Sequence, residues 1–123
     1  TPQLDWMAEN VRELRGGIAK ALLHARRLDD GIAVYYSQAS VHAGTLMNRT
    51  HAKAQWGFMR WIEDVGLQYR LLSYAQVTAG DGLAGIKVLF LPFCAALSPE
   101  ECTAVQRFVE NGGLVVADSA PGV

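Results

Sequence analysis

The sequence predicts an α/β fold: a doubly wound, mainly parallel sheet of about four strands with helices on both faces. Three observations in the last third of the chain carry this prediction. Residues 87–93 form an apolar run, which is typical of a strand buried on both faces. A capping box, Ser98-Pro99-Glu100-Glu101, then begins a helix that Asn111-Gly112-Gly113 ends. Residues 114–117 form a second apolar run, and two buried strands joined by such a helix predict a parallel pair with a right-handed crossover.

Helical spacing predicts which faces of the helices are buried. In the helix after the capping box, one face is expected to contain Cys102, Val105, Phe108 and Val109. Residues 5–28 are expected to form the first helix, with an apolar stripe at steps of three and four residues. The stripe consists of Val11, Leu14, Ile18, Leu22 and Ala25. Gly16-Gly17 interrupts it at a cost of about 1 kcal/mol per glycine relative to alanine, so we expect close packing of this helix on a neighbour.

The middle of the chain supplies two more strands and a helix. Residues 32–36 are rich in β-branched and aromatic side chains and predict the first strand, followed by a polar loop over residues 37–50. Residues 51–65 predict a helix ended by Gly66, and residues 67–74 predict the next strand, followed by a loop at 78–85. The buried face of that helix is expected to contain Ala54, Phe58, Trp61, Ile62 and Val65. Placing the strand near residue 69 beside the first, and those near 88 and 115 on its other side, gives a flavodoxin-like order.

Length and composition restrict the class of protein. The 123 residues are expected to form a single domain, 1–123, that has been processed or cut from something longer, because the chain starts at Thr1 rather than Met. Half the residues are apolar and the net charge is −1 without a basic stripe, so nucleic acid is not an expected partner. No apolar run approaches the roughly 20 residues of a membrane span, so a membrane is not expected either. The cellular compartment is left unassigned, with the cytoplasm favoured.

Candidate ligand-contacting residues follow the strands, because ligands of such sheets gather at the carboxyl ends. Ser37, Gln38 and Ser40 follow the first strand, while Asp118 and Ser119 follow the last. The phosphate-binding loops GxGxxG and GxxxxGK[ST] are absent from the sequence, so no cofactor is expected. Cys94 and Cys102 form no metal pattern with His24, His42 or His51, and we expect both to be reduced core thiols rather than a disulfide.

No catalytic residues are predicted. Cys94 lacks a glycine-flanked nucleophile elbow, and no histidine follows it in the chain. Ser119 and His42 can meet in such a fold, but no spacing argues for a pair, and a loop-facing hydroxyl is the preferred interpretation of Ser119.

Trp56 is the unusual side chain of the second predicted helix. At about 100° per residue it falls on the side of Arg60 and Glu63, opposite Phe58 and Ile62. Trp56 has three interpretations: an interface anchor, a platform for stacking a sugar, or packing at the helix start. The interface anchor is favoured because Trp is enriched at interface hot spots.

Three segments together resemble a known domain. They are IAVYYSQASVHA, GFMRWIEDVGLQYRLLS and GIKVLFLPFCAALSPEECTAVQRFVENGGLVVADSAPGV, and they resemble the trimerisation domain of family 42 glycoside hydrolases, the β-galactosidases. The resemblance runs over nearly the whole chain from about Glu13. It implies a flavodoxin-like domain, similar to class I glutamine amidotransferases without their catalytic residues, which follows a catalytic (β/α)8 barrel and mediates oligomerisation.

The amidotransferase likeness also implies where a nucleophile would lie. That cysteine follows the strand corresponding to residues 114–117, where Ser119 stands without the flanking glycines, whereas Cys94 follows the preceding strand. We therefore expect a non-catalytic domain of a glycoside hydrolase-like protein. Its expected partners are copies of itself, a trimer by resemblance, and the catalytic barrel of a parent chain. The alternatives are a small-molecule or sugar-binding module using the strand-end loops, and a hydrolase using Ser119 or Cys94.

Overall fold

The computed structural model describes residues 1–49 and 51–121. Thr50, the last residue of the predicted loop, and Gly122-Val123, the end of the resembling segment, lie outside the described residues. The strands are β1 (Ile32–Tyr35), β2 (Arg70–Leu72), β3 (Val88–Leu91) and β4 (Leu114–Ala117). The helices are α1 (Pro2–Gly16), α2 (Ile18–His24), α3 (Gln38–Leu46), α4 (His51–Asp64), α5 (Tyr74–Thr78) and α6 (Pro99–Glu110).

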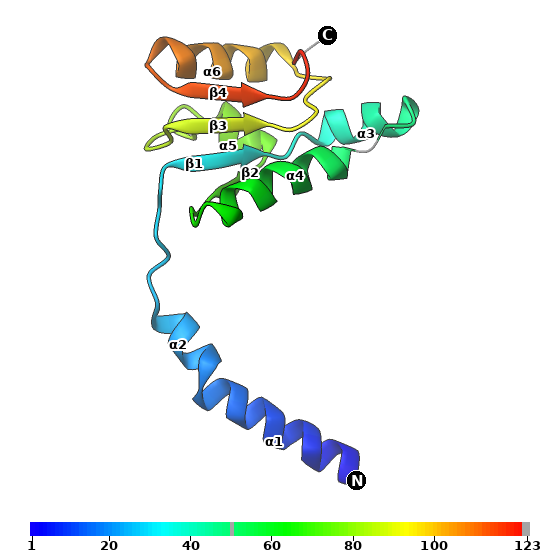
Figure 1. Ribbon diagram of the computed structural model, residues 1–123, viewed down its shortest axis with the longest axis vertical. Helices are drawn as coiled ribbons and strands as arrows, with labels where there is room; N and C mark the ends of the chain where they lie inside the picture. The colour runs from blue at the N-terminus through cyan, green and yellow to red at the C-terminus, as the bar shows by residue number, and fades with distance from the viewer. Residues whose placement is uncertain (50, 122–123) are drawn as a thin grey trace.

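The sheet confirms the predicted fold class and strand order. Its order is β2-β1-β3-β4, and all three neighbouring pairs are parallel. In register, Ala33 lies opposite Arg70 on one side and Leu89 on the other, and Phe90 lies opposite Val116. Figure 1 shows the strands running side by side toward α3, while the N-terminal helices lead away from the sheet.

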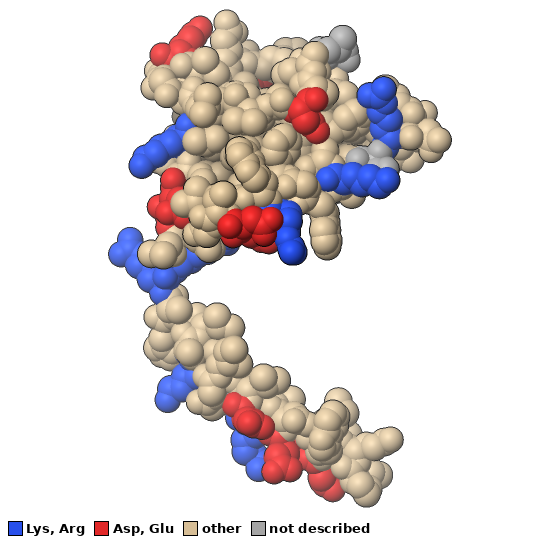
Figure 2. All heavy atoms as spheres, in the orientation of Figure 1, with Lys and Arg blue, Asp and Glu red and all other residues tan. Residues whose placement is uncertain are grey.

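Alternation along the strands divides the core between the two sheet faces. One cluster combines Tyr35, Leu89 and Leu91 with Val77 of α5 and Phe108 of α6. The other combines Ile32, Val34 and Phe90 with Ile62 of α4. Helices therefore cover both faces, as predicted, and in Figure 2 acidic and basic side chains are interspersed over the visible surface.

Helix α6 begins and ends as predicted, and the predicted buried face is confirmed at Phe108, which is in the core, and at Val105, which packs against it. The Ser98 Oγ accepts from the Glu101 N–H at 3.2 Å, and the Ser98 N–H donates to the Glu101 carboxylate at 2.5 Å. Gly112 ends the helix with φ +89°, where the absence of a Cβ avoids strain. Cys102 and Val109 were expected to be buried but are exposed. Glu101 is buried in their place, so the buried stripe combines Glu101 with Val105 and Phe108.

Helices α3 and α5 were not predicted. The predicted loop 37–50 contains α3, because the Ser37 hydroxyl caps the helix by accepting from the Ser40 N–H at 3.2 Å. Gly44 within it lies against the Phe93 ring, and an added Cβ would approach that ring to 3.0 Å. The second helix, α5, has its own capping box from Ser73 and Gln76 and shortens the predicted strand before it.

Exposure differs from prediction at the sheet edge and on α4. Strand β4 was expected to be buried, but it forms an edge of the described sheet, and Leu114 is 58% exposed. Trp61 and Val65 were assigned to the buried face of α4, yet both are more than half exposed, whereas Ile62 is buried. Trp61 nevertheless contacts the core, with its ring centroid 5.8 Å from that of Phe90.

The N-terminal helix is real but does not pack as expected. It divides at Gly17 into α1 and α2 and ends at His24 rather than near residue 28. Neither helix contains a buried residue, and a Cβ added at Gly16 would meet nothing within 4 Å among the described residues. The expectation that the glycines allow close packing on a neighbour is therefore wrong for this chain alone. Within the part of the chain described, no helix combines the length and apolar character needed to cross a membrane.

Candidate functional site

The parallel sheet brings the predicted strand-end residues to one edge. Ser37 and Ser40 lie beyond β1, Cys94 lies beyond β3, and Asp118 and Ser119 lie beyond β4. The question at this edge is which polar atoms remain available for a ligand or a reaction.

The hydroxyls of Ser37 and Ser40 are engaged within the protein. Both residues are fully buried, and both hydroxyls donate to the carbonyl of Ala96, at 3.3 Å from Ser37 and 2.9 Å from Ser40. The Ala96 N–H donates back to the Ser40 Oγ at 3.1 Å. These bonds fasten the start of α3 to the loop between β3 and α6. Gln38 differs, because it is exposed and its amide nitrogen lies 3.1 Å from the His42 Nε2.

A buried polar pair behind this edge was not predicted. The Tyr35 hydroxyl, on the central strand β1, donates to the Glu101 carboxylate of α6. Tyr35 is fully buried and Glu101 is 2% exposed. Burial raises the pKa of Tyr35, and the hydrogen bond and charge of Glu101 raise it further. The only sequence signal was the capping-box glutamate, whose inward direction the capping motif does not specify.

Cys94 is held as a thiol rather than a thiolate. It is fully buried, and its Sγ lies 3.6 Å from the Pro92 carbonyl, to which it donates weakly. Burial, together with the carboxylates of Glu101 and Asp118, raises its pKa to about 12. Both cysteines are free, as predicted, but only Cys94 is in the core; Cys102 is exposed. A thiol with so high a pKa is a poor nucleophile at neutral pH.

Asp118 closes the end of the third strand. Its Oδ1 accepts from the Phe93 N–H at 2.7 Å, and Phe93 has a φ of +43°, in the left-handed region that a bulky side chain rarely adopts. The carboxylate therefore holds a strained turn. The neighbouring Ser119 hydroxyl is buried and lacks a hydrogen-bond partner among the described residues.

His51 also lies near this edge, beside the predicted loop that follows the first strand. It begins α4, is 5% exposed, and its ring meets that of Tyr36 edge-on at 5.8 Å. Burial lowers its pKa, and the Asp118 charge opposes the shift in part. Within residues 1–49 and 51–121, its Nε2 has no hydrogen-bond partner. No recorded hydrogen bond there joins His51 to Ser119 or Cys94, and no cluster of three or more metal-ligating side chains is found.

Trp56 lies on the outer face of α4 and is 74% exposed. A shallow depression of about 290 Å³ is found nearer the strand ends, between α4 and β4. Its lining residues are Lys53, Ala54, Gly57, Phe58, Trp61 and Asp118. A larger groove of about 810 Å³ lies between α5 and α6, toward Lys87 and Gly113 at the amino ends of β3 and β4. The larger groove therefore lies away from the predicted strand-end residues.

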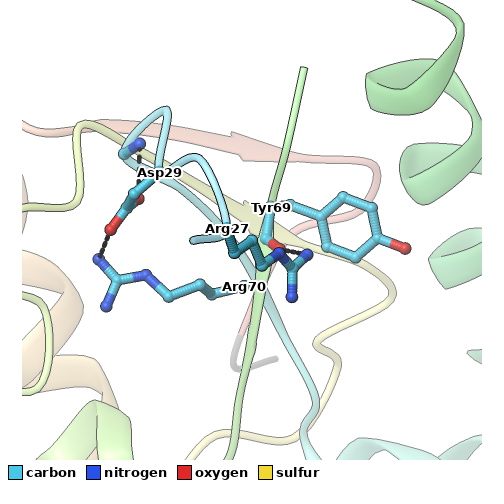
Figure 3. A network of polar contacts seen from close by, with 5 residues as sticks. Arg27, Asp29, Tyr69 and Arg70 are labelled. Atoms are coloured by element: carbon cyan, nitrogen blue, oxygen red, sulfur yellow. Dashed lines mark hydrogen bonds and ion pairs between the residues drawn. The ribbon is translucent and has the colours of Figure 1, made fainter. Parts of the chain in front are cut away.

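A polar network fixes the base of the N-terminal helices to the sheet edge. Figure 3 shows the Arg27 guanidinium donating to the Tyr69 carbonyl, and Asp29 paired with Arg70. The Asp29 Oδ2 lies 2.8 Å from a guanidinium nitrogen of Arg70. The Gln68 N–H donates to the Asp30 carboxylate at 2.7 Å. Asp29 also accepts from the Gly31 N–H at 3.0 Å. The segment before β1 is therefore bound along β2, the opposite edge strand from β4.

Comparison with known proteins supports the fold. No family model matches the sequence, and no curated protein matches it. Among solved structures, the chain is similar to the crystal structure of β-galactosidase from Bifidobacterium adolescentis, with a TM-score of 0.60 and 24% sequence identity. The match covers 71% of this chain and 38% of that chain, so this chain spans well under half the length of the protein it matches. The likeness establishes a shared α/β fold with a region of that enzyme.

Proposed function

We propose that this chain is a non-catalytic assembly domain of a glycoside hydrolase-like protein, and that it associates with copies of itself. The observation that carries the proposal is the number of large apolar side chains facing water. Folded monomers rarely leave contiguous apolar patches of more than a few hundred Å² exposed. On α1 and α2 the exposed apolar side chains are Leu4, Trp6, Met7, Val11, Leu14, Ile18, Leu22 and Leu23, and on α4 Trp56 and Trp61 are exposed.

The residues at the carboxyl ends of the strands support the non-catalytic part of the proposal. The serine hydroxyls there bind Ala96, the Cys94 thiol has a raised pKa, and Asp118 holds the Phe93 backbone. A nucleophile, a base and an orienting group are not assembled by any bonds recorded among the described residues. The glycoside hydrolase context rests on the fold shared with part of a β-galactosidase. A trimer and a catalytic barrel as partner come from the family resemblance; the proposal itself requires only self-association.

Sedimentation velocity over a concentration series tests this proposal. We expect a monomer at low concentration and a larger species at high micromolar concentration. Trp56→Ala then locates the contact: a loss of about 1–2 kcal/mol in association would identify Trp56 as an anchor, and an unchanged affinity places the contact elsewhere on the chain. A strictly monomeric chain at every concentration would contradict the proposal, and so would hydrolysis of nitrophenyl galactosides that disappears in Ser119→Ala or Cys94→Ala.

The depression beside α4 favours a second candidate function, sugar binding. The Trp61 indole is 56% exposed, and Lys53 and Asp118 supply a donor and an acceptor beside it. An aromatic face with nearby polar groups suits a sugar, whose ring stacks while its hydroxyls form hydrogen bonds. Calorimetric titration with galactose decides this: saturable binding lost in Trp61→Ala and kept in Trp56→Ala supports a sugar site, and an absence of binding heat in wild type refutes it.

A further inference from the structure

The N-terminal arm, residues 2–24, carries an apolar seam with the spacing of a coiled coil. Apolar residues recur at alternating steps of three and four from Leu4 onward. Within the arm they are Leu4, Met7, Val11 and Leu14 on α1, and Ile18 and Ala21 on α2. On α1 the four seam residues lie within about 80° of one another, and so narrow a seam suits another helix, whereas a helix covering a sheet presents a wider stripe. The spacing therefore indicates what kind of surface the arm contacts.

Nothing in the described residues covers this seam. Leu4, Val11, Leu14 and Ile18 are each more than half exposed, and Figure 1 shows the arm leading away from the sheet. The network at Arg27, Asp29 and Arg70 binds the segment between the arm and β1 to the neighbouring strand β2. Isolated helices shorter than about 12–15 residues are marginal in water, and the arm has 15 residues in α1 and 7 in α2. A covered seam would stabilise helices of this length.

Charge along the arm favours another copy of the same arm as the covering element. Asp5 and Glu9 lie toward its N-terminus, Arg15 and Lys20 lie toward its C-terminal end, and Arg12 and Glu13 lie between them. Two arms side by side in opposite directions would place the acidic end of each near the basic end of the other. A lipid surface fits less well, because interfacial helices carry a polar face rich in Lys and Arg, and α1 has acidic residues there.

We propose that two copies of this chain pair through antiparallel N-terminal arms, seam against seam. This names the contact surface within the proposed self-association and rests on it. Five large side chains between Leu4 and Ile18, each contributing on the order of 100 Å², would bury roughly 500 Å² per copy. Stable interfaces bury about 800 Å² per partner, so the pairing is weak and depends on concentration.

Sedimentation velocity of a seam variant and its matched control tests the contact. Leu14→Asp places a charge in the seam on α1, whereas Leu23→Asp places it on α2 at a residue outside the seam that is 84% exposed. We expect Leu14→Asp to raise the dissociation constant at least tenfold, and Leu23→Asp and Trp56→Ala to leave it unchanged. Both aspartate variants should keep the thermal midpoint of the sheet domain, because neither residue is buried.

The outcomes separate the two proposals. A monomeric wild type removes self-association altogether. A wild type that associates, with Leu14→Asp associating equally well, overturns arm pairing and leaves self-association standing. Loss of association in Trp56→Ala alone moves the contact to α4. A limiting mass of three chains overturns the pairing while supporting assembly, and vesicle binding that Leu14→Asp abolishes overturns it in favour of a lipid contact.

Cross-linking tests the orientation of the arms. Met7→Cys in a Cys102→Ser background places one exposed thiol near one end of each arm, while Cys94 stays buried. Antiparallel arms keep these thiols apart, so we expect little disulfide-linked dimer on mild oxidation. Efficient dimer formation would show parallel arms and overturn the proposed orientation.

Discussion

Replacing Glu101 with alanine should destabilise the fold far more than replacing its neighbour Glu100. Glu101 accepts hydrogen bonds from the Tyr35 hydroxyl and from the Ser98 N–H, and it is 2% exposed. Glu101→Ala removes both acceptors at once and leaves the Tyr35 hydroxyl in the core without a partner. Glu100 lies in the same first turn of α6 but is exposed, so Glu100→Ala is a matched control.

The magnitude follows from the two bonds. A hydrogen bond to a charged group contributes about 1.5–3 kcal/mol, so losing two should cost about 3–6 kcal/mol. A domain of this size is stable by about 5–15 kcal/mol, so the loss is a large part of the total. For a domain of 60–100 residues, each kcal/mol corresponds to roughly 4–8 °C in the thermal midpoint. Tyr35→Phe removes only the donor of one of these bonds and should cost about 1.5–3 kcal/mol.

Urea unfolding followed by circular dichroism measures these differences. We expect the midpoint of Glu101→Ala to fall well below that of wild type, with Tyr35→Phe between them and Glu100→Ala close to wild type. The double variant Tyr35→Phe/Glu101→Ala should cost less than the sum of the singles, because both remove the same bond. Equal midpoints for Glu101→Ala and Glu100→Ala would refute this account of the core.

Three further predictions follow from the same structure. Gly113→Ala should destabilise by about 2 kcal/mol or more in thermal unfolding, because its Cβ would lie 2.3 Å from the Phe108 ring; an unchanged midpoint would show that the ring moves freely. Ellman's reagent should react quickly with the exposed Cys102 and slowly with Cys94, whose pKa burial raises to about 12; two equally fast thiols would contradict the packing. Burial lowers the His51 pKa below its ordinary 6.5, so its neutral form favours the folded state. The contribution of neutral His51 to stability is complete above pH 6.5 and is lost as the pH falls through the lowered pKa. His51→Phe should therefore reduce the dependence of the urea midpoint on pH between these two values.

The strand order of the sheet could be predicted because the buried strands have a recognisable composition. The runs around Val34 and Leu89 are apolar throughout, and only strands buried on both faces need that composition. The capping box at Ser98 likewise specifies where α6 begins. By contrast, α3 was missed because serine and glycine fit a loop and a helix equally well. Its capping bond from Ser40 to Ser37 becomes visible only in three dimensions.

The candidate site was predicted in position and missed in detail. Parallel strands had to bring Ser37, Ser40 and Ser119 to one edge, but their sequence does not say which way each hydroxyl points. The Tyr35–Glu101 contact joins residues 66 positions apart, beyond the reach of local spacing. The seam at Leu14 could be predicted from local spacing, but its partner could not. An apolar stripe predicts that a helix is covered, and it does not say whether the covering surface belongs to the same chain.

Hydrogen exchange of the arm amides at increasing protein concentration tests the central claim most directly. An arm without packing exchanges quickly, whereas a paired arm is protected. We predict that protection of residues 2–24 rises with concentration, while protection of β1 and β3 in the sheet core stays constant. Arm amides that exchange quickly at every concentration would contradict assembly through this helix.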